Sequence, residues 1–484
     1  MKGLTEMTLS QMREAMVCGD VSSRELTESW LQALEAKEKD IGAFITLCPE
    51  RALREADAID EARARGEELS PLAGIPMAVK DNICVKGLPT TCASKMLENF
   101  VPPYNATAYE KLHQCPLLGK TNMDEFAMGS TTENSAFHVT RNPRNTACVP
   151  GGSSGGSAAC VAAGEAPFAL GSDTGGSIRQ PAAFCGVVGM KPTYGSVSRY
   201  GLVAFASSLD QIGPMTRTVR DNALVLDALA GYDRLDSTSV KRGYTPMGRQ
   251  LDEGVQGLKI ALPKEFFGKG LSAEVKKQVL HAAKLLEKEG AILTEVSSPS
   301  LDYALPAYYV ISSAEASSNL ARFDGVRYGR RAAEYADLEE LYVKSRSEGF
   351  GAEVKRRILL GTYTLSAGYF DAYYKKALQV RTLVIRDMER VMQQCDAILG
   401  PVAPTTAYKL GEKTASPLEM YLGDIYTVPV NIAGIPALSL PCGTDSRGLP
   451  VGVQLMGPTF SEPMLYRIGA ALEKAVSCTE KEAE

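Results

Sequence analysis

Two glycine- and serine-rich segments constrain most strongly what this chain can fold into. The first, 151–157 (GGSSGGS), precedes the helix-forming run 158–163, and the second, 171–177 (GSDTGGS), follows the short apolar run 167–170. Glycine lets a backbone turn sharply and approach a ligand closely, and a loop entering a helix N-terminus presents N–H groups that favour an anion. Flexible linkers are the alternative, but linkers seldom lie between an apolar strand and a helix. The segments therefore predict a strand–loop–helix site in an α/β fold.

Charge and composition exclude several classes of protein. The 484 residues include 52 Lys and Arg and 57 Asp and Glu, so the net charge of −5 argues against a strongly basic nucleic-acid clamp. Because no apolar run is long enough to span a bilayer and residues 1–6 lack an apolar signal core, we expect a soluble, cytoplasmic protein without membrane contact. The 11 Cys form no C-x-x-C pair, which favours reduced thiols over a zinc ribbon.

The hydrophobic pattern divides the chain into regions. Residues 1–70 read as helical, with a capping box at 22–25 and Trp30 in a packing position. Strands alternate with helices from about 72 to 215 and again after 258, and one of those helices is predicted at 105–115. Residues of about 303–395 read as mostly helical. We therefore predict an N-terminal helical segment (1–70) packed on one core (71–484) that carries a helical insertion at about 303–395.

Histidine is too scarce for the usual catalytic schemes. The three His lie at 113, 138 and 281, and the G-x-S-x-G match at 151–155 follows a polar, Pro-containing stretch instead of a strand. If a serine is the nucleophile, lysine is the next candidate base. Lys80 ends the apparent strand 75–79, where α/β folds place their sites. A solvated surface lysine is the alternative, and spacing alone does not decide between the two.

Four segments identify a family resemblance. Residues 74–81, 151–156, 171–181 and 184–193 resemble the amidase signature family in order and spacing, and the resemblance covers nearly the whole chain. It implies a single large mixed β-sheet flanked by helices on both faces. It also implies roles for individual residues: Ser177 as nucleophile, Ser153 as a bridging serine after a cis peptide bond, and Lys80 as terminal base. The backbone N–H groups of Thr174, Gly175, Gly176 and Ser177 would form the oxyanion hole.

That chemistry makes a demand on Lys80. Ser177 would attack an amide carbonyl and pass its proton through Ser153 to a neutral lysine, and water would then resolve the acyl-enzyme. Lowering a lysine pKa from about 10.4 to about 7 takes about 4.6 kcal/mol, and burial acts in that direction. We therefore expect Lys80 to be buried.

Within the family, segments 122–130, 313–325, 353–358 and 423–431 resemble the glutaminase subunits of tRNA-dependent amidotransferases. The resemblance implies that Arg357 binds the carboxylate of glutamine, that Asp424 holds its ammonium and that Tyr308 adds a phenol, although the adjacent Tyr309 could take that place. An Arg357 that faces solvent is the alternative. Asp124, Glu125 and Thr174 could line an ammonia exit or could cap loops.

The same resemblance implies a division of labour. Ammonia from glutamine would amidate Glu-tRNA(Gln), Asp-tRNA(Asn) or both in an ATP-dependent B subunit, which would hold the ATP, the Mg²⁺ and most of the tRNA. A small C subunit would complete a heterotrimer, and this chain itself would need no metal or cofactor. A stand-alone amidase for small or hydrophobic amides and a non-catalytic scaffold are the competing hypotheses.

Overall fold

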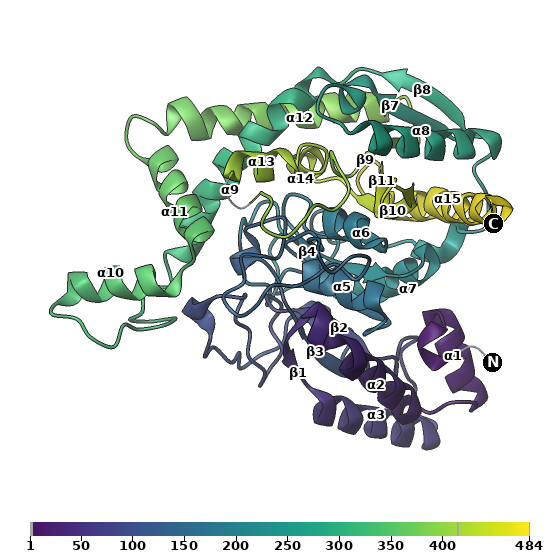
Figure 1. Ribbon diagram of the computed structural model, residues 1–484, viewed down its shortest axis with the longest axis horizontal. Helices are drawn as coiled ribbons and strands as arrows, with labels where there is room; N and C mark the ends of the chain where they lie inside the picture. The colour runs from purple at the N-terminus through teal and green to yellow at the C-terminus, as the bar shows by residue number, and fades with distance from the viewer. Residues whose placement is uncertain (1–2, 414–415, 484) are drawn as a thin grey trace.

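The computed structural model describes residues 3–413 and 416–483. One 11-stranded mixed sheet runs through the molecule in the order β1-β3-β2-β4-β6-β5-β10-β11-β9-β7-β8 (Figure 1). Its strands are β1 (Phe44–Leu47), β2 (Met77–Lys80), β3 (Leu117–Thr121), β4 (Phe168–Asp173), β5 (Val188–Lys191), β6 (Gln211–Thr216), β7 (Lys259–Pro263), β8 (Ile292–Val296), β9 (Ala397–Pro401), β10 (Ala437–Thr444) and β11 (Pro450–Met456). The predicted single mixed α/β sheet is confirmed.

Helices surround this sheet, and in Figure 1 α1–α3 lie beside β1–β3, far from β7 and β8. The helices are α1 (Leu9–Cys18), α2 (Ser23–Ile41), α3 (Pro49–Ala64), α4 (Thr107–Glu110), α5 (Gly155–Ala163), α6 (Arg179–Cys185), α7 (Val219–Leu229), α8 (Ala273–Lys288), α9 (Ala304–Leu320), α10 (Leu338–Gly349), α11 (Ala352–Leu365), α12 (Lys376–Met392), α13 (Pro417–Leu422), α14 (Val428–Ala433) and α15 (Glu462–Ala483).

The two faces of the sheet carry different helices. Leu438 and Ser439 are neighbours on β10 and therefore point to opposite faces. On one face, α15 packs so closely that a Cβ built on Gly469 would lie 2.6 Å from Cδ2 of Leu438. On the other face, Oγ of Ser439 donates to the backbone oxygen of Arg179, where α6 begins (3.1 Å). Helices thus cover both faces.

Parallel pairing brings three strand ends together. β2 runs parallel to β3 and to β4, with Lys80 paired to Thr121 and Val79 to Leu170. The carboxyl ends of parallel strands share one edge of a sheet. Lys80, at the end of β2, therefore lies beside Asp173, which ends β4 and begins the second glycine-rich turn.

The N-terminal region forms as its local signals predict, with one addition. Ser22 and Glu25 make a reciprocal capping box at the start of α2, and Trp30 is fully buried. Residues 1–70 are not purely helical, however, because β1 pairs antiparallel with β3 and extends the sheet. The division of the chain at residue 71 stays a prediction, and residues 1–2, 414–415 and 484 lie outside the described residues.

The predicted helix at 105–115 is wrong in extent. Only the single turn of α4 forms there, with Ala106 at its N-cap. The side chain of Asn105 instead accepts a hydrogen bond from the backbone N–H of Lys86 (2.6 Å) and donates to Glu110 (2.6 Å). The Asn105 side chain is thus engaged elsewhere and does not cap the helix. In the region predicted as a helical insertion, α9 to α12 are interrupted by the irregular segment 321–337.

Membrane-spanning helices and metal-binding clusters are both absent from the described part of the chain. No helix within 3–413 and 416–483 is long and apolar enough to cross a bilayer. Over the same ranges, no group of three or more His, Cys, Asp or Glu side chains is arranged to hold a metal ion.

One carboxyl group is buried in this fold without a hydrogen-bond partner among the described residues. Both carboxyl oxygens of Glu165, just after α5, are buried and have no hydrogen-bond partner among the described residues. Burial raises the pKa of Glu165 from 4.5 to about 9, and the nearby carboxylate of Glu38 adds to the rise while Lys37 opposes it. The folded protein therefore holds a proton there that the unfolded chain releases above about pH 4.5.

We predict that Glu165→Gln stabilises the protein increasingly as the pH rises. With a raised folded-state pKa, the stability contribution of Glu165 is complete below its unfolded pKa and is lost as the pH rises toward 9. Because glutamine does not titrate, the variant should melt about 1–3 °C above the wild type near pH 8.5 and show little difference near pH 4.5. Calorimetry at the two pH values measures this, and an equal effect at both would contradict the buried-acid explanation.

Candidate active site

Lys80 is held at the end of β2 in a fully buried position. Burial lowers its pKa from 10.5 to about 7, although the carboxylates of Asp124, Asp173 and Asp210 favour the charged form. Desolvation therefore outweighs the acids, because the ammonium loses its water. This lowered pKa favours neutral Lys80 at a pH where an exposed lysine is charged.

Three serines surround the amine of Lys80. Its Nζ lies 2.8 Å from Oγ of Ser153, 2.8 Å from Oγ of Ser154 and 3.0 Å from Oγ of Ser172. The hydroxyl of Ser154 donates its proton to the backbone oxygen of Ser172 (3.0 Å), so in its contact with Lys80 the Ser154 oxygen is the acceptor. The Ser172 hydroxyl already accepts from Nδ2 of Asn82 (2.9 Å). With N–H donors directed to Ser154 and Ser172, the lone pair of a neutral Lys80 is free to accept the proton of Ser153.

The two glycine-rich loops meet at Ser177. The Gly152–Ser153 peptide bond is cis, and the N–H of Ser154 donates to the backbone oxygen of Ser177 (3.1 Å). This contact brings the Lys80–Ser153 pair and Ser177 into one site. Ser177 retains 7% exposure, whereas Lys80 and Ser153 have none. A substrate can therefore reach Ser177 while the base behind it stays dry.

The backbone around Ser177 permits close approach from one side. A Cβ on Gly175 would lie 2.5 Å from the phenol oxygen of Tyr308, and Gly176 has a φ of +138° and faces Thr427. Only glycine fits both positions. The Gly176 N–H is already donated to Oδ1 of Asp173 (2.9 Å), so it is not the free donor that the family resemblance implied. The N–H groups of Thr174, Gly175 and Ser177 have no such bond to a side chain among the described residues.

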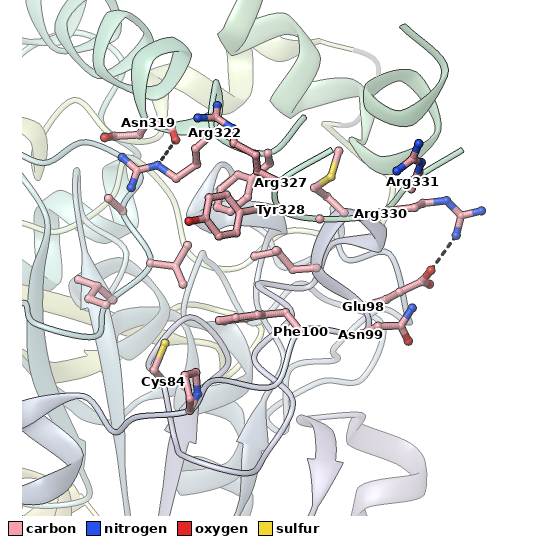
Figure 2. Close-up of a pocket in the computed structure, with 18 of the residues that line it drawn as sticks. Cys84, Glu98, Asn99, Phe100, Asn319, Arg322, Arg327, Tyr328, Arg330 and Arg331 are labelled. Carbon is pink, nitrogen blue, oxygen red and sulfur yellow. Dashed lines mark hydrogen bonds and ion pairs between the residues drawn. The ribbon is translucent and has the colours of Figure 1, made fainter. Parts of the chain in front are cut away.

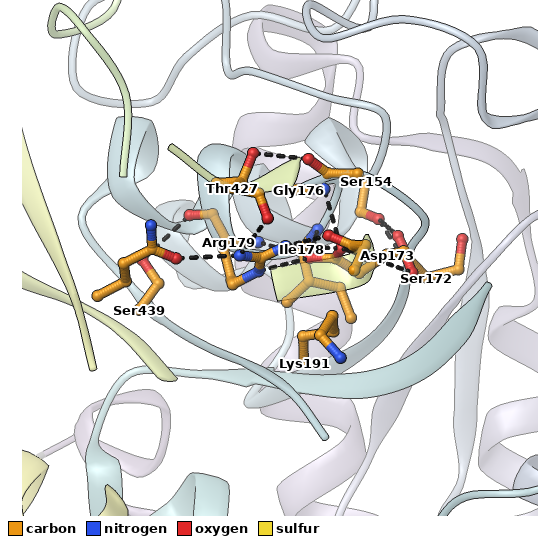
Figure 3. Close-up of polar contacts among 12 residues, drawn as sticks. Ser154, Ser172, Asp173, Gly176, Ile178, Arg179, Lys191, Thr427 and Ser439 are labelled. Atoms are coloured by element: carbon orange, nitrogen blue, oxygen red, sulfur yellow. Dashed lines mark hydrogen bonds and ion pairs between the residues drawn. The ribbon is translucent and has the colours of Figure 1, made fainter. Parts of the chain in front are cut away.

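A buried ion pair fixes the second loop from behind (Figure 3). Nε and Nη2 of Arg179 each lie 3.1 Å from a carboxyl oxygen of Asp173, and both side chains are fully buried. Nη1 of Arg179 also donates to the backbone oxygen of Thr427 (3.1 Å) and to Gln454 (3.0 Å). Burial raises the pKa of Asp173, but Arg179 outweighs it and holds the pKa at about 2. This bidentate pair ties the loop to α14 and β11.

A second pair of charged side chains lies beside this loop. Asp424 accepts hydrogen bonds from Ser130 (2.9 Å) and from the phenol of Tyr309 (2.8 Å), and burial raises its pKa to about 6. Tyr309 thus makes the contact with Asp424, whereas Tyr308 packs edge-on against it and reaches Gly175. The two adjacent tyrosines take different places around the site, so both belong to it.

Arg357 is buried on α11 and does not face solvent. Its Nε donates to Glu353 (2.7 Å), and its guanidinium lies 4.5 Å and 4.6 Å from the ring centroids of Tyr309 and Tyr421. Nη1 is buried and has no hydrogen-bond partner among the described residues. A buried unpaired donor on a cation is costly, and an anionic ligand would satisfy it. Glu353 therefore occupies the Nε edge of the Arg357 guanidinium, and Nη1 remains available to bind a carboxylate.

The three residues considered for an ammonia exit act as loop caps in this structure. Asp124 accepts from the N–H groups of Thr131 (3.2 Å) and Asn134 (3.3 Å). Glu125 accepts from the N–H of Gly351 (2.8 Å), and Thr174 donates to Asp210 (2.6 Å).

Comparison with known proteins shows the family of the chain. The amidase family model matches residues 25–466, and the chain belongs to the amidase family. It is a close homologue of the A subunit of the glutamyl-tRNA(Gln) amidotransferase from Caldanaerobacter subterraneus subsp. tengcongensis, with 58% identity over 474 residues, which is 98% of this chain and 97% of that protein.

Solved structures give the same result for the fold. The A subunit of the Thermotoga maritima glutamyl-tRNA(Gln) amidotransferase has a TM-score of 0.81 and 43% identity, over 98% of this chain and 96% of that one. A bacterial aryl acylamidase has a TM-score of 0.87 at only 25% identity, over 98% of this chain and 97% of that one. The backbone is therefore shared by amidases with different substrates, and the side chains must decide the substrate.

Sequence reasoning missed several residues that hold this site. Asp173 and Arg179 lie in a motif that was recognised, and an Asp before Gly-Gly-Ser is a signal for a side chain that caps its own loop. Ser154 adjoins Ser153 and could have been noticed for that reason. Glu353 lies four residues before Arg357 on α11, a spacing that could have indicated their ion pair. Tyr421 had no local signal, because it meets Arg357 and Glu353 only through the tertiary fold.

We predict that Arg179→Met strongly destabilises the protein, because it leaves Asp173 buried without a counter-charge. The expected loss is about 3–5 kcal/mol in the free energy of unfolding, measured by urea titration of the loss of tertiary fluorescence. Arg65→Met is the matched control, since Arg65 pairs with Glu67 at the exposed surface and should cost less than about 1 kcal/mol. Similar losses in both variants would show that the buried pair is not the anchor of the loop.

Proposed function

We propose that this chain is the glutaminase subunit of a tRNA-dependent amidotransferase, releasing ammonia from glutamine for the amidation of Glu-tRNA(Gln), Asp-tRNA(Asn) or both. The observation that carries the proposal is the placement of a buried cation with a free donor, Arg357, and a buried carboxylate, Asp424, beside the Ser177 loop. The high identity to A subunits of glutamyl-tRNA(Gln) amidotransferases supports it.

The charges favour glutamine over an apolar amide. The carboxylate of glutamine would accept from Nη1 of Arg357, and its ammonium would lie against Asp424. Tyr308 would line the same space. An apolar amide would leave Nη1 of Arg357 unpaired and would bring no cation to Asp424, so the site discriminates against it. This argument weighs against a stand-alone amidase for hydrophobic substrates.

The reaction follows from the hydrogen-bond chain. Ser177 attacks the side-chain amide carbon, its proton passes to Ser153, and Ser153 passes its own proton to neutral Lys80. The N–H groups of Gly175 and Ser177, with Thr174 beside them, would stabilise the oxyanion. Protonated Lys80 returns the proton through Ser153 to the leaving ammonia. Water then attacks the acyl-enzyme by the same route and releases glutamate.

The proposed function also requires partner subunits. The chain would act in the cytoplasm as part of a heterotrimer, with ATP, Mg²⁺ and most of the tRNA held by a B subunit and with a C subunit bracing the pair. The net charge of −5 suits a protein that does not itself grip tRNA.

The deciding experiment is a glutaminase assay on the pure chain and on the complex with its co-expressed partners. Ammonia release that is lost in Ser177→Ala and falls strongly in Arg357→Met would support the proposal. Turnover of an aryl amide with no response to glutamine would replace it with the stand-alone amidase.

We predict that activity requires neutral Lys80. Because its pKa is about 7, kcat should fall as the pH drops below 7, with a limb near that value. Lys80→Arg keeps a positive charge but cannot release its proton, so kcat should fall at least about 100-fold. Steady-state kinetics as a function of pH measure both effects. Near-normal kcat in the Lys80→Arg variant would rule out lysine as the base.

We predict a separate pH effect on glutamine binding through Asp424. Its pKa of about 6 means that the carboxylate protonates as the pH falls below 6 and loses its hold on the ammonium, so KM should rise there. Asp424→Asn should raise KM about 10- to 100-fold and abolish that limb. Glutaramate, which lacks the α-amino group, is the matched control substrate. If glutaramate showed the same limb, Asp424 would not be the ammonium partner.

A further inference from the structure

A cavity of about 990 Å³ lies apart from the candidate catalytic residues (Figure 2). It opens between the irregular segment 321–337 and the loop 95–104, with residues 202–204 as its third wall. Segment 321–337 is fixed to the opposite wall because the N–H of Arg330 donates to the backbone oxygen of Met96 (2.7 Å). The cavity is therefore a formed groove between two parts of the chain that are distant in sequence.

The floor of this groove is apolar. Cys84, Phe100 and Leu202 line it, and the floor side chains in Figure 2 include Phe100 and Cys84. Apolar side chains continue at its mouth, where Tyr104 is 40% exposed and Tyr328 is 59% exposed. Exposed apolar side chains are also present on segment 321–337 and on α10, which packs against the turn at 95–97: Val326, Tyr335, Leu338, Tyr342 and Val343.

The walls of the groove are rich in arginine. Arg330 pairs with Glu98 (2.7 Å), and Arg327 pairs with Asp324 (3.2 Å). Arg322 donates to a backbone oxygen (2.8 Å) and Arg331 to the phenol of a tyrosine (2.6 Å). Within residues 3–413 and 416–483, neither Arg322 nor Arg331 has a carboxylate within ion-pair distance. Two guanidinium groups therefore remain available to an anionic ligand.

We propose that this groove is the docking site for an extended acidic segment of a partner subunit, which places an apolar or aromatic side chain on the Phe100–Leu202 floor and carboxylates on Arg322 and Arg331. This inference rests on the proposed function, which requires a partner that consumes the ammonia. The charge of the walls selects an acidic ligand. The exposed apolar side chains of segment 321–337 and α10 offer a polypeptide further contacts outside the cavity.

The test uses the full chain and its co-expressed partners. Arg322→Glu combined with Arg331→Glu should weaken the affinity of the complex at least about 10-fold, and the wild-type affinity should fall with added salt more steeply than that of the variant. Ala204→Trp, which fills the groove without changing charge, should weaken it as well. Lys277→Glu on the exposed surface of α8 is the matched charge control and should have no effect. Biolayer interferometry on the immobilised chain measures the affinities.

Two outcomes would overturn the proposal. One is unchanged affinity in both the charge-reversal and the Ala204→Trp variants, each with a wild-type melting temperature. The other is that ATP, used as a small anionic probe, binds in the groove of the wild type but not in that of the Arg322→Glu variant, while the affinity for the partners is the same in both. Basal glutaminase activity of the free variants should equal that of the wild type. A wild-type complex with no glutaminase activity would instead defeat the proposed function, so the two failures are distinguishable.

Discussion

The desolvation of one amine, Lys80, is the constraint on which the rest of the site depends. Three aspartates lie near enough to favour its charged form, yet burial still brings its pKa to about 7. An ion pair with any of these acids would keep the lysine charged and useless as a base. The surrounding contacts are therefore to serine hydroxyls, which tolerate either charge state and leave the lone pair directed at Ser153.

That arrangement requires the nearby acids to be occupied elsewhere. Asp173 is neutralised by Arg179, and the pair also anchors the loop that presents Ser177. Asp124 and Asp210 are turned into loop caps. Asp424 and Arg357 differ from these acids because each can still bind a ligand. Asp424 is held by the neutral hydroxyls of Ser130 and Tyr309. Arg357 is held by Glu353, but its Nη1 is unpaired among the described residues. The site thus separates charges that serve structure from charges that can meet a substrate.

Much of this could be predicted from sequence where the signal is local. The capping box at Ser22, the buried Trp30 and the strand ending at Lys80 follow from patterns within a few residues, and they are present in the structure. The helix predicted at 105–115 is only one turn long, and Asn105 bonds to the distant Lys86 instead of capping it. The choice between Tyr308 and Tyr309 depended on helix orientation, which adjacent positions do not reveal.

By itself, the sequence determined the family and the mixed α/β sheet, and it predicted the Lys80, Ser153 and Ser177 group, because those residues stand in motifs with specific order and spacing. Only the tertiary structure decided which donors and acceptors are free. Among neighbours on the chain, it assigned the Gly176 N–H to Asp173 and one edge of Arg357 to Glu353, and it left Nη1 of Arg357 buried and unpaired among the described residues. Spacing along a chain says which groups can meet, whereas the burial and the partners that the fold supplies decide their charge and availability.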